Sequence, residues 1–398
     1  MSAERLAVID RVVRKGITSG GFPGAAVLVG RGGYVVYDHS FGRVTWTTSS
    51  RAVSTNSTIY DLASLTKVIA TTTAAMILYD QGKLDLDAPV QRYLPEFTGA
   101  RKDRVTIRQL LTHHSALPAG LELWRGKLTP SQARKRVLEA PLRSYCAPGR
   151  CFEYSDLGMI VLGYAIEKIS GQRLDAFAAQ RVFGPLRMSS TLFKPAGNVR
   201  PAIAPTAHAS RRGYALRGEV HDENAFVLGG IVGHAGLFGT ASDLALFAQM
   251  MLNGGELNGV RIVADTTVAL FTRVQRDSRT LGWEAAGGVR GSGTYLSPAA
   301  YGHTGFTGTS IWIDPARQMF VVLLTNRVYA PRARRPGDVI ADVRNDVADA
   351  AALAITGDIS VPTYPMPDPF RSDTTHAWKG PAGLAAQPTA RIPARRAP

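Results

Sequence analysis

Strand patterns occur at both ends of this 398-residue chain, whereas the middle is patterned as helices. Near the start, apolar residues at 24–30 and 34–42 flank a Gly-rich turn at 31–33, which predicts a β-hairpin. Near the end, strand patterns return at 310–315 and 319–326. This order favours one antiparallel sheet built from both ends of the chain and covered by helices, with a helical region inserted between them. The predicted fold class is α+β.

The helical signals also set the expected organisation of the chain. Helical periodicity is clearest at 66–84, 106–114, 130–140, 157–171 and 240–255, and a final helix is predicted at 339–355. We expect one domain over residues 1–355, with a sheet part at about 1–80 and 274–355 and a helical part at about 81–273. Residues 356–398 are rich in Pro, Ala and Arg and lack periodicity, so we expect a disordered tail there.

The formal net charge of +15 raises the question of a polyanionic partner. Most of the basic residues are Arg, and they are scattered along the chain, so we expect no nucleic-acid partner. No segment is both long and apolar enough to span a bilayer. The first residues lack the basic-then-apolar order of an export signal. The sequence as it stands predicts a cytoplasmic protein, and a periplasmic or extracellular one if a leader is missing.

The Cys and His residues give no pattern typical of a metal site. Cys146 and Cys151 lie five residues apart, which is too few cysteines for a disulfide framework and the wrong spacing for a zinc knuckle. We therefore favour a reduced pair in a loop. His221, Asp222 and His234 also match no zinc signature. We expect neither a metal nor another cofactor.

A serine and a lysine lie three residues apart where a helix is expected to begin. This spacing puts the side chains of Ser64 and Lys67 on one helical face, so a hydroxyl can meet an amine. Serine needs an adjacent base to act as a nucleophile, and a partly desolvated lysine can lose its proton near neutral pH. The start of a helix also offers free N–H groups to a developing oxyanion. A serine and a lysine at this spacing also occur by chance, so the motif supports a catalytic role only together with other motifs.

A second group, Tyr154-Ser155-Asp156, directly precedes the helical pattern that starts at residue 157. A cation from Lys67 near the phenol of Tyr154 would favour the phenolate, giving a second base and a proton donor. Packing in the core is the alternative for Tyr154. Asp156 is interpreted equally well as the N-cap of the following helix or as a substrate contact.

The third group is His303-Thr304-Gly305, at the start of the late strand patterns. Glycine lets the backbone approach a ligand closely, and a strand edge offers N–H and C=O groups to an extended substrate. We therefore expect these residues to form one wall of a cleft.

The three motifs, at 64–67, 154–156 and 303–305, resemble in order and context those of the penicillin-recognising serine hydrolases. Within these, the chain is similar to the class C β-lactamase-related branch, which includes esterases, D-aminopeptidases and D,D-carboxypeptidases. The resemblance extends from about residue 20 to 355. It implies a β-lactamase/transpeptidase-like fold, in which an antiparallel sheet is flanked by helices and accompanied by a helical subdomain, with the active site between the two parts.

The resemblance also implies a role for each site residue. Ser64 is the acylated nucleophile, Lys67 its proton acceptor, and Tyr154 the general base and acid. The N–H groups of Ser64 and Phe306 form the oxyanion hole. Asp156 and the strand residues 303–305 line the substrate site.

Two residues depart from the usual pattern of β-lactamases and peptidases: Asp156 stands where they carry Asn, and His303 where they carry Lys. Both changes weaken the attraction for a substrate carboxylate. The sequence therefore predicts a small ester or amide as substrate. The alternatives are a β-lactamase, a D-alanyl-D-alanine carboxypeptidase or D-aminopeptidase, an idle wall-binding module and, from net charge alone, a polyanion-binding protein.

Overall fold

A computed structural model describes residues 1–287, 291–358, 360–374 and 378 of the chain. Its main sheet has six antiparallel strands in the order β2-β1-β11-β10-β9-β8. The strands are β1 (Gly24–Arg31), β2 (Tyr34–Gly42), β8 (Glu284–Ala285), β9 (Tyr301–Thr304), β10 (Ser310–Asp314) and β11 (Met319–Thr325). Because β1 pairs with β11, both ends of the chain share one sheet, as the sequence predicts.

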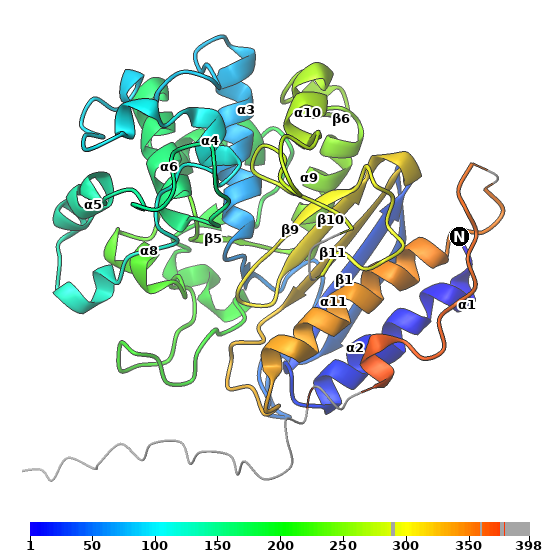
Figure 1. Cartoon of the computed structure of the whole chain (residues 1–398). Helices are drawn as coiled ribbons and strands as arrows, with labels where there is room; N and C mark the ends of the chain where they lie inside the picture. The colour runs from blue at the N-terminus through cyan, green and yellow to red at the C-terminus, as the bar shows by residue number, and fades with distance from the viewer. Residues whose placement is uncertain (288–290, 359, 375–377, 379–398) are drawn as a thin grey trace, which may run out of the picture.

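Helices cover both faces of this sheet (Figure 1). On β1, Ala25 and Val27 pack against α2 (Val8–Thr18) and α11 (Pro336–Leu353). The alternate residues Ala26 and Leu28 belong to the larger core that continues into the helical region. Successive strand side chains point to opposite faces, so a strand buried on both sides reads as a continuous apolar run.

The helical region lies beside the sheet (Figure 1). It contains α3 (Thr73–Asp80), α4 (Ile107–Leu111), α5 (Pro130–Glu139), α6 (Asp156–Ser170), α7 (Leu174–Ala178), α8 (Glu223–Val227), α9 (Ala241–Leu252) and α10 (Asp265–Thr272). Two small sheets join strands β3 (Tyr60–Asp61), β5 (Leu237–Gly239) and β4 (Leu192–Phe193), and strands β6 (Glu256–Leu257) and β7 (Val260–Arg261). Helix α1 (Ala3–Leu6) precedes α2. The helix expected at 66–84 begins with a π-helical turn at Lys67–Thr72 and continues as α3.

The expectation of a disordered tail from residue 356 onward is wrong for residues 370–373. They form a 3₁₀ turn against α2 and α11, and the side chain of Phe370 is buried there. Apolar burial and ion pairs with distant helices hold this segment, and local periodicity does not report such contacts. Residues 379–398 of the expected tail lie outside the described residues.

The expectation of reduced cysteines is also wrong, because Cys146 and Cys151 are joined by a disulfide. Gly149, with a φ of +80°, turns the chain between them and leaves their Cα atoms 6.1 Å apart, within the range that a disulfide spans. Disulfide frameworks and zinc knuckles need other cysteine numbers or spacings, but a single bond across a local turn does not.

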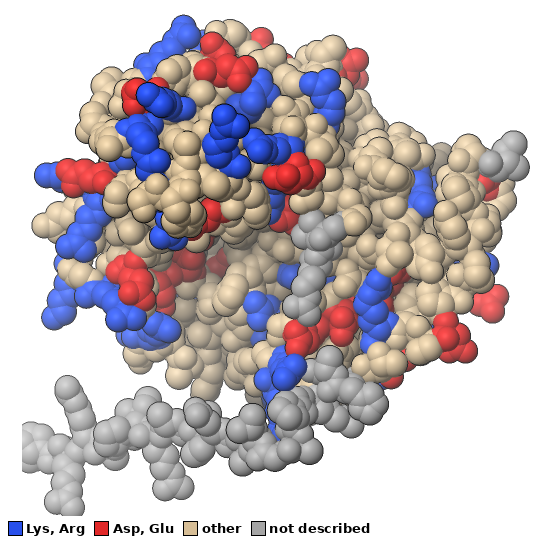
Figure 2. All heavy atoms as spheres, in the orientation of Figure 1, with Lys and Arg blue, Asp and Glu red and all other residues tan. Residues whose placement is uncertain are grey.

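Two general features agree with the composition. Across the described residues, no helix combines the length and apolar content needed to cross a bilayer. On the face shown in Figure 2, Lys and Arg side chains are interspersed with Asp and Glu rather than gathered in one tract.

Candidate active site

Ser64 lies on a sharp turn between β3 and the helix that contains Lys67. The residue before it, Ala63, has a φ of +47°, a conformation that costs energy for any residue with a side chain. The carboxylate of Asp61 holds this turn by accepting a hydrogen bond from the Ala63 N–H at 2.8 Å. The hydroxyl of Ser64 therefore projects from a backbone position that its neighbours fix.

The amine of Lys67 is the centre of the site, and its side chain is fully buried. Its Nζ donates to Ser64 Oγ at 2.8 Å and to the carbonyl oxygen of His234 at 3.1 Å. It also lies 2.7 Å from Asp156 Oδ1, with which it forms an ion pair. The hydroxyl of Ser64 and the amine of Lys67 are therefore hydrogen-bonded, as the spacing predicts, and the carboxylate of Asp156 is a third member of the group.

The pKa of Lys67 moves in the direction opposite to the one expected from burial alone. Desolvation lowers this pKa, but the charge of Asp156 and the hydroxyl of Tyr154 outweigh burial and raise it above its ordinary value. At rest Lys67 is therefore an ammonium ion that donates to Ser64. Before Lys67 can accept the proton of Ser64, it must give one up.

The N-cap position of α6 is occupied by Ser155, which leaves the side chain of Asp156 free to reach Lys67. Ser155 is the N-cap of α6: its hydroxyl accepts from the N–H of Gly158 at 3.0 Å and donates to the carbonyl of Pro118 at 2.7 Å. Asp156 is the first residue of the helix, so its carboxylate is free to pair with Lys67. The N-cap interpretation of Asp156 is thus wrong by one position.

The ring of Tyr154 lies beside the amine, with Lys67 Nζ 5.0 Å from the ring centroid. Burial raises the pKa of Tyr154, while Lys67 and hydrogen bonds to Lys67 and Ser64 oppose that rise. The net pKa is above the ordinary value, so the phenol is protonated at rest. As the sequence predicts, the cation of Lys67 lowers the pKa of Tyr154, but burial raises this pKa by more.

His303 also lies beside Tyr154, with the two ring centroids 6.0 Å apart. Its side chain is buried, and its Nδ1 lies 2.8 Å from the carbonyl oxygen of Thr304. Burial lowers the pKa of His303 well below its ordinary value, and Lys67 adds to the effect. His303 therefore contributes a neutral imidazole where a cation is usual in the families that the sequence resembles.

The turn after β9 is fixed to the backbone that precedes Ser64. A Cβ atom at Gly305 would lie 2.6 Å from the carbonyl oxygen of Leu62, so only glycine allows this approach. The hydroxyl of Thr307 donates to the Asp61 carbonyl at 2.7 Å, and that of Thr309 to the Leu62 carbonyl at 3.1 Å. These contacts bring Phe306 and Thr307 to the cavity that Ser64 lines, whereas His303, Thr304 and Gly305, which were expected to line it, are not among its lining residues.

The backbone N–H groups of Ser64 and Phe306, the expected oxyanion hole, are both free to bind a ligand. Neither donates to another group within the described part of the chain. Both residues line one cavity of about 620 Å³, together with Tyr154 and Asp156. Fixed donors that need no reorganisation are what stabilises a tetrahedral oxyanion.

Sequence reasoning missed several residues around this cavity. Trp124 lines it, and the rings of His113 and Tyr154 lie 4.6 Å apart. The guanidinium of Arg279 lies 5.5 Å from the Tyr154 ring and pairs with Glu284 at 2.5 Å. These residues come from separate segments and carry no local motif, so only the folded chain brings them together.

Asp156, Asp222 and His234 bring three possible metal-ligand atoms within 4.8 Å of one another. Asp222 Oδ1 already pairs with His234 Nε2 at 3.0 Å, and Asp156 pairs with the ammonium of Lys67. A lysine cation thus stands where a metal ion would otherwise balance the carboxylates.

A serine with a fixed amine and phenol, two free N–H donors and a cleft between a sheet and a helical region define a serine hydrolase. The chain belongs to the beta-lactamase family, whose family model matches residues 9–345. The predicted family and the predicted β-lactamase/transpeptidase-like fold are therefore confirmed.

Curated relatives resemble the chain over most of its length. It is 34% identical over 368 residues to the N-acetylmuramyl-L-alanine amidase of Bacillus subtilis, covering 83% of this chain and 82% of the relative. It is 33% identical over 371 residues to a putative D-alanyl-D-alanine carboxypeptidase of Escherichia coli K12, covering 83% and 84%.

Solved structures share the fold. EstCE1, a hydrolase with promiscuous acyltransferase activity, superposes with a TM-score of 0.71 at 24% identity, covering 88% of this chain and 99% of that one. A class C beta lactamase superposes with a TM-score of 0.69 at 19% identity, covering 87% and 98%.

Proposed function

We propose that this serine hydrolase cleaves small carboxylic esters and amides through a covalent ester on Ser64. The Ser64 oxygen attacks the acyl carbon, and the N–H groups of Ser64 and Phe306 stabilise the resulting oxyanion. The proton of Ser64 passes to the Lys67–Tyr154 pair and then to the leaving oxygen or nitrogen as its bond to the acyl carbon breaks. Water then cleaves the ester by the reverse transfers, releasing the acid and restoring Ser64.

The resting charges make this cycle dependent on pH. Lys67 and Tyr154 are both protonated at rest because the pKa of each is raised. The pair must lose one proton before it can accept the proton of Ser64, and the two groups titrate together. Activity is therefore expected to rise as the pH increases above neutrality.

The observation that carries the substrate class is the neutral His303. A carboxylate bound near Tyr154 would meet the carboxylate of Asp156 in the same cavity, and the neighbouring imidazole of His303 carries no charge. Desolvating a substrate anion there would gain no ion pair from these two residues. A substrate without an essential anionic group avoids this cost.

Hydrolysis of D-alanyl peptides is the second candidate function. The names of the amidase and carboxypeptidase relatives, at 33–34% identity over most of the chain, favour it. The cavity of about 620 Å³ also has room for more than a short-chain ester.

A substrate panel tests these alternatives. Purified protein and its Ser64→Ala variant are assayed on p-nitrophenyl butyrate, nitrocefin and a D-alanyl-D-alanine peptide. We expect the highest kcat/KM on the ester and no turnover by Ser64→Ala. A higher kcat/KM on the peptide or on nitrocefin would reverse the order. Failure of a fluorophosphonate to add covalently to Ser64, read by intact mass, would favour the idle wall-binding module.

We also propose that the protein works in the periplasm or outside the cell, the second of the two locations expected from sequence. The bond between Cys146 and Cys151 supports this, because disulfides persist in oxidising compartments and are rare in the cytosol.

A further inference from the structure

Helix α11 carries a polar stripe on a helix that is otherwise packed in the core. The stripe consists of Asp342, Asn345, Asp346 and Asp349, spaced so that they share one helical face. Asp346 is fully buried and Asp349 is 2% exposed. Buried carboxylates are costly unless they are paired and hydrogen-bonded, so the partners of this stripe show what it is for.

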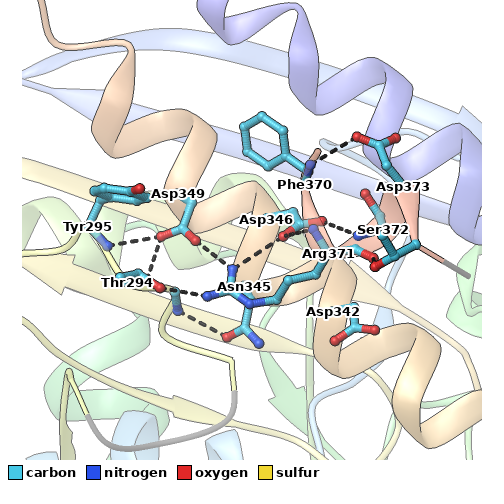
Figure 3. Close-up of polar contacts among 12 residues, drawn as sticks. Thr294, Tyr295, Asp342, Asn345, Asp346, Asp349, Phe370, Arg371, Ser372 and Asp373 are labelled. Carbon is cyan, nitrogen blue, oxygen red and sulfur yellow. Dashed lines mark hydrogen bonds and ion pairs between the residues drawn. The ribbon is translucent and has the colours of Figure 1, made fainter. Parts of the chain in front are cut away.

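One partner is the C-terminal strap, defined here as residues 370–373 (Figure 3). The guanidinium of Arg371 lies 2.6 Å from Asp349 Oδ2 and 3.3 Å from Asp346 Oδ1. The N–H of Ser372 donates to Asp346 Oδ2 at 2.6 Å. Asp373 pairs with Lys15 of α2 at 3.3 Å, which holds the far end of the strap.

The other partner is the approach loop, residues 291–295, which leads toward β9. Asp349 Oδ1 accepts from the N–H groups of Thr294 and Tyr295 at 2.5 and 3.0 Å. Asn345 Oδ1 accepts from those of Gly291 and Gly293 at 2.7 and 3.0 Å. The strap reaches the same loop directly.

Arg371 makes this direct link. Its Nη2 donates to Thr294 Oγ1 at 2.5 Å, while its Nη1 pairs with Asp349, whose other oxygen binds the Thr294 N–H (Figure 3). Arg371 thus contacts the loop itself and also neutralises the carboxylate that binds the loop. Charged hydrogen bonds of this kind are stronger than neutral ones and fix geometry.

The approach loop in turn touches Thr304, the last residue of β9, two residues before Phe306, which lines the cavity. A Cβ atom at Gly291 would lie 3.1 Å from Thr304 Cγ2, so the loop packs directly behind Thr304. Helix α11 also holds the next residue, because Arg344 Nη2 donates to the carbonyl oxygens of Gly305 and Thr309 at 2.6 and 2.7 Å. The contacts from the strap to the cleft are therefore continuous.

We propose that the C-terminal strap positions the segment Thr304–Phe306, which lines the cleft through Phe306, for substrate, with Arg371 as the positioning residue. The inference rests on the proposed function of the cleft and adds a remote determinant of substrate binding. Ser64, Lys67 and Tyr154 are held by other contacts, so loosening the strap acts on binding more than on the reacting groups.

The experiment compares two variants with a matched control. Arg371→Ala removes the ion pair, and Thr294→Val removes only the exposed hydroxyl that accepts from Arg371 and retains the shape of the side chain. The control is Arg173→Ala, which breaks an arginine–aspartate ion pair in the helical region, with Asp175.

We expect Arg371→Ala to raise KM for p-nitrophenyl butyrate about tenfold with kcat within about twofold, the effect of one lost charged hydrogen-bond network. Thr294→Val raises KM less, Arg371→Lys recovers part of the loss, and Arg173→Ala leaves KM unchanged. Hydrogen exchange at the amides of Thr294 and Tyr295 becomes faster in Arg371→Ala. The rate at which a small fluorophosphonate labels Ser64 stays the same.

Two results would overturn the inference: an unchanged exchange rate at 294–295, or faster exchange with unchanged KM, which would make the strap a purely structural element. The proposed function fails separately, if the wild-type protein is not labelled at Ser64. Hydrogen exchange needs no substrate, so it still tests the inference if Ser64 is not labelled. Unchanged exchange at Thr294 and Tyr295 in Arg371→Ala then shows that the strap does not hold the loop, and faster exchange shows that it does.

Discussion

The two walls of the cleft handle charge in different ways. The helical wall, with Ser64, Lys67, Tyr154 and Asp156, places a cation and an anion 2.7 Å apart beside the nucleophile. The strand wall, residues 303–306, lines the cavity through Phe306 and contains the buried, neutral imidazole of His303, and its charged supports lie on α11 and the strap. The reactive charge is compensated beside the nucleophile, whereas the charged side chains that hold the strand wall, Arg344 and Arg371, do not line the cavity.

Removing the amine from the helical wall gives the largest expected effect. Lys67→Met should lower kcat/KM on p-nitrophenyl butyrate by about a thousandfold, because proton transfer from Ser64 loses its acceptor. Thr304→Val on the strand wall should instead raise KM by about tenfold or less. The double variant Lys67→Met/Asp156→Asn controls for the carboxylate left unpaired and should recover thermal stability but not activity. A loss below tenfold in Lys67→Met would remove the distinction between the walls.

Replacing the carboxylate of Asp156 in the helical wall tests whether it controls the charge of Lys67. Asp156 raises the pKa of Lys67, so Asp156→Asn should lower that pKa and move the rising limb of the pH profile of kcat/KM to lower pH by about one unit or more. Glu223→Gln, a cavity residue paired with Arg212, should leave the limb in place. A limb that stays where it is in Asp156→Asn would show that Lys67 does not set it.

Local patterns in the sequence were enough to predict much of this arrangement. The hairpin of β1 and β2, the strands β10 and β11 and the final helix follow from apolar periodicity and turn residues. The pairing of Ser64 with Lys67 follows from their spacing on one turn. Each of these features depends on residues close together in the chain.

What the sequence did not predict depends on contacts between distant residues or on competing energies. Lys67 lies 89 positions before Asp156, and whether burial or the carboxylate controls its pKa is decided only by their distance in the fold. Arg371 compensates carboxylates more than twenty positions away, in a segment whose composition alone indicates disorder. Ser155 and Asp156 are both common helix-capping residues, so composition could not choose between them.

The disulfide belongs to the helical wall, because its loop ends three residues before Tyr154. Breaking it in Cys146→Ser/Cys151→Ser should lower the free energy of unfolding by about 2 kcal/mol, the entropy expected for so short a loop. Denaturant titration measures this change, and the wild-type protein treated with reductant should match the variant. Mass spectrometry after alkylation should find no free thiol in unreduced protein. Two alkylated cysteines would contradict both the bond and the proposed location.

The smallest expected effect concerns the neutral imidazole of the strand wall. The unfolded chain binds a proton on His303 below about pH 6.5, whereas the buried side chain does not, so the free energy of unfolding should fall as the pH falls below that value. The slope from one such histidine is at most about 1.4 kcal/mol per pH unit. His303→Asn should reduce the total slope by that amount. Equal slopes in the wild-type protein and His303→Asn would mean that His303 carries charge in the fold. The strand wall could then attract a carboxylate after all.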